Sequence, residues 1–450
     1  MGEHVERLAG LVAETGWEGI PAAVREHAKL VLLDTIGVIL AGSQQPEVTA
    51  ARSRLLATGG SGATVYAQGF PTSDPRTAAL LNGIAGRSIE LCEGHRYVSC
   101  QGAVQIVPTV LAVGEQVGAS GRDALLALIV GYDAAVRIGA GSKTRALAHQ
   151  NGQWPMLGAV AAGARLRGLD AATTSLALRI GATLVLVPSY LSAVAGATTL
   201  NVAGGMSGFA GTLVAELALA GFAARPNAIE EAFGSLVADG FTPERVTEEL
   251  GTRWEIGRNY FRLRACCNPT YPSLDALEDA LADLKPQPEE IERIDVETYQ
   301  FASVMAEPNP ANYFASKYSL PHAAAATIVR GNAGYGSFTE EARNDPRIVS
   351  LRGRVHIKED PKLTKIYPKE KQGRVTLTLK DGRRTTKFCE NARGDFQRPY
   401  QVAEVRAKFR ELAALVLTPA GVERTEKLVD RFDDVAQVAE LVSLLREQSL

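Results

Sequence analysis

The sequence predicts a mainly α-helical protein, built from a large all-helical domain and a smaller α+β domain. Two patterns support this fold class. From the N-terminus to about Gly257, Ala, Leu, Val and Gly recur at helical spacing. After about Tyr260, β-branched residues alternate with polar ones, which is typical of strands. With 450 residues, the chain also exceeds what one hydrophobic core usually holds, so more than one domain is expected.

The first part of the chain is expected to consist of helices that other helices surround. Residues 23–40 place apolar side chains on one stripe, and Asp74-Pro75 is a typical helix start. Further apolar segments at helical spacing follow at 107–117, 124–138, 157–166 and 171–180. The glycine-rich segment 204–208 could suggest a phosphate-binding loop, but no strand precedes it and no Lys-Ser/Thr follows. Close packing of buried helices is therefore the preferred interpretation.

The α+β part is predicted from strand-like segments and one hairpin. Strands are expected at 291–299, 355–358, 374–379 and 385–388. Lys380-Asp381-Gly382 is a hairpin signal between the last two strands. Residues 322–329 are expected to form a helix within this part.

The last part of the chain returns to helical spacing. Residues 402–414 and 435–445 are amphipathic, and we expect both helices to pack on the helical body. The predicted organisation is therefore a helical domain over residues 1–262, completed by residues 401–450, and an α+β lid domain over residues 263–400.

Charge and cysteine content narrow the function classes. Lys and Arg total 48 against 50 Asp and Glu, a formal net charge of -2, which gives no bulk attraction for nucleic acid or anionic membrane. The N-terminal segment lacks the plan of a signal peptide, and polar residues interrupt the most apolar stretch, 193–221, so no membrane span is expected. The five cysteines include no Cys-x-x-Cys pair, which argues against a disulfide framework and against zinc or redox sites. A reduced, cytoplasmic protein is expected.

A polar loop between two apolar helices, residues 89–102, is the first candidate site. Its functional side chains are Glu90, Glu93, His95, Arg96, Cys100 and Gln101. A long loop rich in such groups is more often a site than a solvated connection with local ion pairs, which is the alternative. A nucleophilic Cys100 paired with His95 is a further alternative, but no third orienting group stands at a recognisable spacing.

Three further segments carry groups that suit a carboxylated substrate. They supply Lys143 and His149 (141–154), Arg262 and Tyr271 (259–272), and Lys317 and His322 (317–322). Cationic and amide donors bind carboxylate oxygens, and a domain junction is a favoured place for a ligand. The alternatives are polarity at helix ends for the lysines and His322, and a solvated linker for Arg262.

Several motifs resemble the MmgE/PrpD family, which includes 2-methylcitrate dehydratases and cis-aconitate decarboxylases. They are LLNGIAGR at 80–87, GAVQIVP at 102–108, GYDAAVR at 131–137, HQNGQWPMLGAVAA at 149–162, FRLRACC at 261–267 and KYSLPHAAAA at 317–326. Their order covers essentially the whole chain. The resemblance implies a large helical domain, a small α+β lid, a homodimer, and no need for a metal or organic cofactor. It also implies chemistry that removes or delivers a proton next to a carboxylate, in dehydration, decarboxylation or epimerisation.

Matched residue by residue, the resemblance implies an altered site. His149 matches the second histidine of the family. Glu90 and Glu93 stand where the family usually has aspartates, and Gly94 replaces a common threonine. The usual His-Pro becomes Cys100-Gln101, so the first histidine is lost from that place.

Three more positions change the chemistry that the resemblance implies. Thr198 and Arg262 stand where the family has lysines, and Tyr271 stands where it has a histidine. Arg262 can bind a carboxylate but cannot serve as a base, because a guanidinium group does not lose its proton in proteins. Thr198 in place of a lysine removes one positive charge, so the expected substrate has fewer carboxylates than methylcitrate, or a different shape.

The leading hypothesis is a cofactor-independent lyase that transfers a proton next to a carboxylate of a small di- or tricarboxylate. His149 is expected to be the general base or acid near its ordinary pKa of about 6.5, opposed by His95, which Glu93 orients. Tyr271 is a further candidate catalytic group on the lid side. The expected substrate-binding residues are Glu90, Arg96, Cys100, Gln101, Lys143, Asn201, Arg262, Lys317 and His322. The alternatives are an epimerase or isomerase on the same scaffold and a non-catalytic carboxylate-binding homologue.

Overall fold

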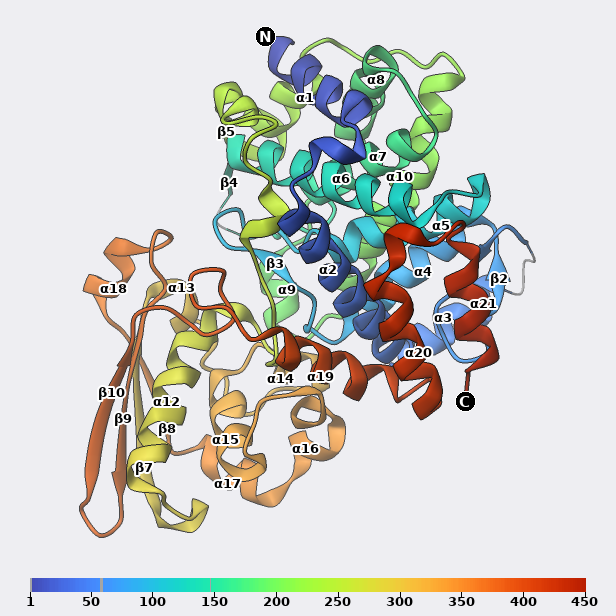
Figure 1. Ribbon diagram of the computed structural model, residues 1–450. Helices are drawn as coiled ribbons and strands as arrows, with labels where there is room; N and C mark the ends of the chain where they lie inside the picture. Colours follow the sequence, from blue (N-terminus) through green and yellow to red (C-terminus); the bar gives the residue numbers. More distant parts are fainter. Residues whose placement is uncertain (1, 57–59, 146) are drawn as a thin grey trace.

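The computed structural model describes residues 2–56, 60–145 and 147–450. It is mainly α-helical with a smaller α+β part, so the predicted fold class is confirmed (Figure 1). The principal helices of the helical part are α1 (Glu3–Glu14), α2 (Ala22–Gly42), α3 (Pro46–Leu56), α4 (Pro75–Ser88), α5 (Ala103–Val117), α6 (Gly121–Gly141), α7 (Trp154–Leu166), α8 (Ala171–Ala182), α9 (Tyr190–Val194) and α10 (Thr199–Leu219). Asp74 caps α4 as expected, because its side chain accepts from the backbone N–H groups of Arg76 and Thr77.

Helices α5, α6, α7 and α10 form the centre of the helical part. Nearly every residue of α6 and α7 is buried, which explains why these segments are apolar on all sides. Small residues let α7 and α10 approach closely, since a Cβ on Gly163 would lie 2.1 Å from the carbonyl oxygen of Gly211. The glycine-rich segment 204–208 lies inside α10, so the preference for helix packing over a phosphate loop is confirmed.

Among the described residues, α6 and α10 are long and apolar enough to cross a membrane by length and composition alone. Their most apolar windows are 94% and 61% buried inside the protein. Packing within the protein therefore accounts for the apolar character of α6, and for only part of that of α10. The cytoplasmic location stays a prediction.

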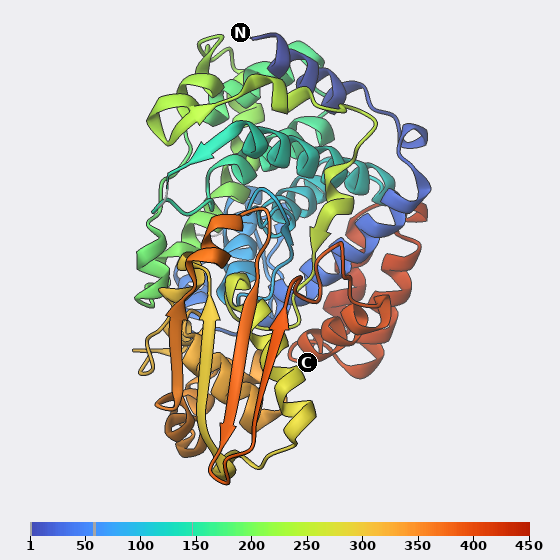
Figure 2. The same ribbon diagram turned by 90° about the vertical axis from the view of Figure 1, so that its left-hand side faces the viewer.

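The α+β part contains a four-stranded sheet in the order β10-β9-β7-β8 (Figure 2). Its strands are β7 (Ile291–Thr298), β8 (Val355–Glu359), β9 (Gly373–Leu379) and β10 (Arg384–Cys389). β7 pairs with β8 in parallel, with Val296 opposite Ile357, and the other pairs are antiparallel. All four strands were predicted, and so was the hairpin between β9 and β10.

Two helices cover one face of this sheet. They are α12 (Tyr271–Leu284) and α15 (Leu320–Arg330), and their buried side chains share a core with β7 and β9. The sequence predicted most of α15. It did not predict α12, because Pro269, Tyr271 and Pro272 suggested a polar junction rather than a helix start.

The C-terminal helices return to the helical body, as Figure 1 shows. They are α19 (Val402–Ala413), α20 (Pro419–Asp430) and α21 (Ala439–Glu447), and the expectation did not include α20. Lys408 of α19 forms a buried ion pair with Asp34 of α2 at 2.7 Å, and its Nζ also donates to the carbonyl oxygen of Leu91 at 2.6 Å. The division of the chain at residues 262 and 400 stays a prediction.

A short strand pair brings the polar loop after α4 to the point where the two parts meet. β3 (Gly94–His95) pairs with β6 (Asn259–Tyr260), and Gly94 lies opposite Tyr260. Figure 1 places β3, α9 and α14 (Tyr313–Ser316) around this junction. The fold thus collects segments that are more than 150 residues apart in sequence, such as 89–102 and 259–268.

Candidate active site

A buried carboxylate, that of Glu90, binds three side chains at the junction. Its Oε1 accepts hydrogen bonds from Arg87 at 2.5 Å and from the Tyr318 hydroxyl at 2.7 Å, and its Oε2 pairs with Arg262. All four side chains are buried. Burial alone would raise the pKa of Glu90. The two guanidinium groups outweigh this effect and hold its pKa well below the ordinary range. Glu90 is therefore a permanent anion between two permanent cations.

The local sequence explains how this cluster forms. Glu90 follows the end of α4 with a φ of 54°, a left-handed conformation that is uncommon for residues other than glycine. Arg87, in the last turn of α4, passes close to α10, where a Cβ on Gly204 would lie 2.4 Å from the arginine Cγ. The glycine in α10 thus leaves room for the arginine that binds Glu90.

Arg262 reaches Glu90 because it lies just after strand β6, which pairs with β3 beside Glu90. Besides the carboxylate, its guanidinium donates to the Tyr260 hydroxyl at 3.1 Å and to the carbonyl oxygen of Glu90 at 3.2 Å. A Cβ on Gly94 would lie 2.5 Å from the Tyr260 hydroxyl oxygen. Glycine at this position, where the resemblance implies a threonine, therefore makes space for Tyr260.

A small cavity of about 50 Å³ lies beside Glu90. It is lined by Glu90, Ser99, Gln101, His149, Gln150, Tyr190, Tyr260, Arg262, Cys267, Asn268, Pro269, Phe301, Tyr318, Tyr367 and Lys371. Four of the predicted site residues thus meet here: Glu90, Gln101, His149 and Arg262. Arg262 Nε and Gln101 Oε1 are buried without a hydrogen-bond partner in the described part of the chain, which suggests a polar ligand.

His149 is held as a neutral ring. Its Nδ1 accepts the backbone N–H of Asn151 at 3.2 Å, and the ring stacks on Tyr190 with 5.8 Å between centroids. Because Nδ1 is an acceptor, the neutral ring carries its proton on Nε2. Burial first, and then the Arg87 and Arg262 cations, lower the pKa of His149 to about 3. The expectation that it works near its ordinary pKa is therefore wrong, and its Nε2–H is a hydrogen-bond donor.

Gln105 of α5 holds the loop that carries His149 in place. The side-chain oxygen of Gln105 accepts the backbone N–H of Gly152 at 3.0 Å and the Ser207 hydroxyl of α10 at 2.9 Å. Its amide nitrogen donates to the carbonyl oxygen of Gln101 at 2.9 Å. One buried amide thus links the two polar loops of the site.

Lys371 is the main residue that sequence reasoning missed. It enters the cavity from the α+β part, just before β9, and its Nζ donates to Asn268 Oδ1 at 3.1 Å. Burial first, and then the Arg96 and Arg262 cations, lower the pKa of Lys371 to about 7. In the sequence it ends a charged stretch, 362–371, which carried no signal that this half-buried lysine lines a cavity.

Two further predicted substrate-binding residues, Lys317 and Asn201, do not line the cavity. Lys317 Nζ donates to the carbonyl oxygen of Ile89 at 3.3 Å, and burial lowers the pKa of Lys317 to about 8. Asn201 is buried in α10, and neither its amide nitrogen nor its oxygen has a hydrogen-bond partner within residues 2–56, 60–145 and 147–450. Neither residue binds another predicted site residue directly.

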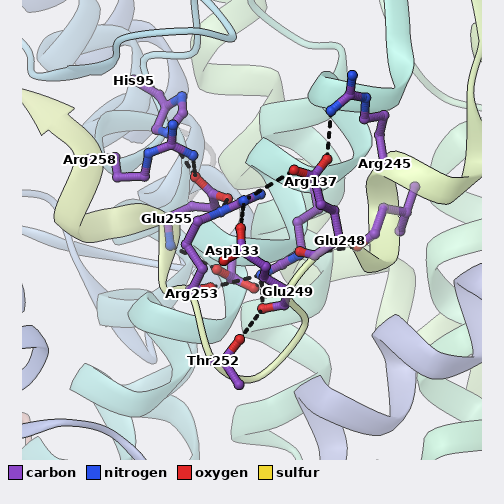
Figure 3. Close-up of polar contacts among 11 residues, drawn as sticks. His95, Asp133, Arg137, Arg245, Glu248, Glu249, Thr252, Arg253, Glu255 and Arg258 are labelled. Atoms are coloured by element: carbon purple, nitrogen blue, oxygen red, sulfur yellow. Dashed lines mark hydrogen bonds and ion pairs between the residues drawn. The ribbon is translucent and has the colours of Figure 1, made fainter.

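The predicted pairing of His95 with Glu93 is wrong. His95 Nε2 instead lies 3.1 Å from Glu255, which also binds Arg253 and Arg258 in the network of Figure 3. His95 is not among the residues that line the cavity. Its role is to hold the segment around Glu255 against the helical body.

Glu93 likewise binds other groups of the protein. Its carboxylate accepts from the Tyr132 hydroxyl at 2.7 Å, the backbone N–H of Ala103 at 2.8 Å and the Asn259 amide at 3.3 Å. Burial raises the pKa of Glu93 to about 7. Because it is absent from the cavity lining, we assign it a structural part in holding β6 beside the start of α5.

Two lid-side predictions are also corrected. The Tyr271 hydroxyl donates to the carbonyl oxygen of Arg264, and burial raises the pKa of Tyr271 well above its ordinary value. His322 places Nε2 2.8 Å from the carbonyl oxygen of Ser337 and accepts from Arg352 at 2.9 Å through Nδ1. Both residues pack inside the α+β part and do not line the cavity.

Arg96, Lys143 and Cys100 do not line the cavity either. Arg96 pairs with Asp395 at 2.5 Å and so ties the polar loop to the segment before α19. Lys143 is exposed on the short strand β4 (Ser142–Thr144). Burial raises the pKa of the Cys100 thiol well above its ordinary value, so a nucleophilic Cys100 is not supported.

Across the described residues, no group of three or more His, Cys, Asp or Glu side chains could hold a metal ion.

The Glu90 cluster predicts a large effect on stability. Glu90→Gln should lower the free energy of unfolding by about 3–5 kcal/mol, because Arg87 and Arg262 would remain buried without a counter-charge. Urea denaturation of both proteins measures this difference. The control is Glu423→Gln, which removes an exposed pair with Lys427 and should cost less than about 1 kcal/mol. Equal effects of the two substitutions would contradict the proposed importance of the cluster.

Comparison with known proteins gives the same family over both parts of the chain. Residues 6–245 match the model of the MmgE/PrpD N-terminal domain, and residues 265–434 match that of the C-terminal domain. The cis-aconitate decarboxylase-like protein oryM of Aspergillus oryzae is 25% identical, and the match covers 99% of this chain and 97% of that protein. The cis-aconitate decarboxylase of Aspergillus terreus is also 25% identical, with 95% and 93% covered. The human cis-aconitate decarboxylase is 24% identical, with 95% and 91% covered.

The matches to the relatives span 95–99% of the chain, and the two domain models cover the cavity segments except Tyr260 and Arg262, which lie between them. They agree with the motifs at 80–87, 149–162, 261–267 and 317–326, each of which contributes to the Glu90 cluster or to the cavity. On its sequence and on the two domains that it combines, this chain belongs to the MmgE/PrpD family.

Proposed function

We propose that this protein is a carboxy-lyase that decarboxylates a small unsaturated carboxylate of the cis-aconitate type. We further propose that its own side chains carry the reaction without a metal or organic cofactor. The supporting observation is the cavity in which Arg262, Lys371 and neutral His149 meet beside Glu90. The names of the relatives favour decarboxylation over dehydration.

The charges around the cavity suit an anionic substrate. Arg87 and Arg262 carry two positive charges against the single negative charge of Glu90, so the cluster keeps a surplus of one. Lys371 adds a further cation whenever it is protonated. Carboxylates would be drawn to these groups, and charge-assisted hydrogen bonds in a buried site are strong.

The proposed reaction needs one proton and no oxidant. In cis-aconitate, a carboxymethyl group is attached to a double bond that is conjugated with another carboxylate. When the bond to the carboxymethyl CO2 group breaks, CO2 leaves and its electron pair forms a new methylene double bond. The electrons of the old double bond then form an enolate at the other carboxylate, and one proton adds to the carbon beside it.

His149 suits the enolate stage of this reaction. A neutral imidazole that donates Nε2–H can stabilise negative charge developing on a carboxylate oxygen, as preorganised donors do in low-dielectric sites. The guanidinium of Arg262 would hold a carboxylate of the same substrate. In this account His149 works as a hydrogen-bond donor and does not change its protonation between pH 5 and pH 8, since its pKa is lowered to about 3.

We also propose that the α+β part acts as a lid. The cavity of about 50 Å³ is far smaller than the roughly 300–1,000 Å³ of ordinary ligand sites. Phe301, Tyr318, Tyr367 and Lys371 enter it from the α+β part. Movement of this part away from the helical body would admit a substrate, and closure would then exclude water.

The proposed function predicts a specific product pattern. Incubation with cis-aconitate in deuterium oxide should give CO2 and an alkene with two geminal protons, with one deuterium beside a carboxylate. Proton NMR over time measures this. Deuterium exchange without CO2 release would instead indicate the isomerase alternative, and binding without any change would indicate a non-catalytic homologue. Either result would contradict the proposal.

The proposed role of His149 as a hydrogen-bond donor predicts that its substitutions lower activity to different degrees. His149→Ala should lower turnover at least about a hundredfold, while His149→Gln, which keeps an N–H donor, should lose less. Initial rates with cis-aconitate between pH 5 and pH 8 measure both, and the wild type should show no protonation step of His149 in this range. The control is His356→Gln, because His356 is exposed on β8. Turnover of His149→Ala close to that of the wild type would remove His149 from the mechanism.

We propose a homodimer on the evidence of an apolar surface near the His149 segment. Leu147, Val187, Leu191 and Val202 are 59%, 51%, 51% and 43% exposed. The backbone N–H of Tyr190 donates to the carbonyl oxygen of Leu147, so two of the contributing segments are neighbours. Light scattering should give twice the 47.9 kDa of one chain, and Leu191→Glu should shift the mass toward the monomer. A wild-type mass of one chain would contradict the dimer.

A further inference from the structure

Most of the titratable groups that line the cavity in the described part of the chain are unsuited as proton donors. Arg262 does not release its proton, and Glu90 is locked as an anion by its three partners. His149 is neutral, with its pKa lowered to about 3, and burial raises the pKa of the Cys267 thiol to about 12. The proton that the proposed reaction consumes must therefore come from another group.

The lining tyrosines are equally unsuited. Burial raises the pKa of Tyr260 to about 12, and it raises that of Tyr367 above its ordinary value. The pKa values of Tyr190 and Tyr318 are raised still further, again by burial first. The Tyr318 hydroxyl is already committed to Glu90 at 2.7 Å. A phenol in this cavity would thus be a weak acid at neutral pH.

Lys371 differs from all of these groups in its placement. It comes from the α+β part, whereas His149 lines the same cavity from the helical part. Its Nζ has one hydrogen-bond acceptor, Asn268 Oδ1 at 3.1 Å, and lies 6.0 Å from the centre of the Tyr260 ring. No carboxylate pairs directly with it among the described residues, so its ammonium group is free to turn to a ligand in the cavity.

The surroundings of Lys371 keep its proton exchangeable. Arg96, after β3, and Arg262, after β6, face Lys371. Their positive charges lower the pKa of Lys371, as does desolvation. Asp395, from the segment before α19, and Cys267, before α12, act in the opposite direction. Asp395 itself is paired with Arg96 at 2.5 Å, which limits its effect. A lysine balanced in this way can release a proton near neutral pH.

We propose that Lys371 is the proton donor of the reaction, placed over the substrate by the α+β part. This inference rests on the proposed decarboxylation. The protonated Nζ would give one proton to the enolate carbon as the new C–H bond forms, and the electron pair of the N–H bond would stay on the nitrogen as a neutral amine. Solvent would restore the proton after CO2 and the product leave. Atoms and charge balance with one proton consumed per CO2 released.

The test separates proton transfer from charge. Lys371→Arg keeps a cation that does not release its proton. Its turnover of cis-aconitate should fall about 10²–10⁴-fold. Its dissociation constant for tricarballylate, a saturated and unreactive tricarboxylate, should change less than about tenfold. Lys371→Met should lose turnover and bind tricarballylate more weakly as well. The matched control is Lys369→Arg, since Lys369 is exposed in the same loop and should behave like the wild type.

A second measurement does not depend on turnover. In protein labelled with ¹³C at lysine Cε, one NMR resonance should titrate near pH 7 and should vanish in Lys371→Arg. A Lys371 resonance that titrates only near the ordinary value of about 10.4 would overturn the proposal, whatever the substrate. Turnover of Lys371→Arg within tenfold of the wild type would overturn it too. A wild type that leaves cis-aconitate unchanged contradicts the proposed function instead, while the titration still decides whether Lys371 exchanges a proton.

Discussion

A buried carboxylate needs compensating partners, and Glu90 obtains them from three separate segments of the chain. Arg87 comes from the end of α4, Arg262 from the segment after β6, and Tyr318 from the α+β part. Removing any one would leave a charge or hydroxyl without its partner in a dry environment, which is costly. The cluster therefore holds the two loops and the α+β part together in the closed arrangement of the proposed lid. The cavity lies directly beside it.

Much of the fold could be predicted because it depends on local patterns. Apolar residues at helical spacing located α2 and α4 to α8, and β-branched alternation located the four strands of the sheet. Other features depend on contacts between distant residues. The parallel pairing of β7 with β8 has no local signal, and α12 begins with Tyr271-Pro272, which also suits a loop. Proline at the first helical turn is compatible with both interpretations.

The site was predicted only in part, for the same reason. His149, Glu90, Gln101 and Arg262, which the sequence named as candidates, all line the cavity. The identity of a histidine does not reveal its partner, so His95 could be assigned to Glu93 although the fold pairs it with Glu255. His322 and Tyr271 looked equally suitable, yet both satisfy their polar atoms within the α+β part. Lys371 could not be recognised, because the entry of one lysine of a charged segment into a cavity follows only from how that segment packs.

The central claim is that a carboxylated substrate binds between the Glu90 cluster and Lys371. A crystal structure of the protein with tricarballylate tests it most directly. The account predicts one carboxylate within hydrogen-bond distance of Arg262, another near Lys371, and His149 Nε2 facing the ligand. Tricarballylate bound elsewhere on the protein, with this cavity closed and unchanged, would contradict the account.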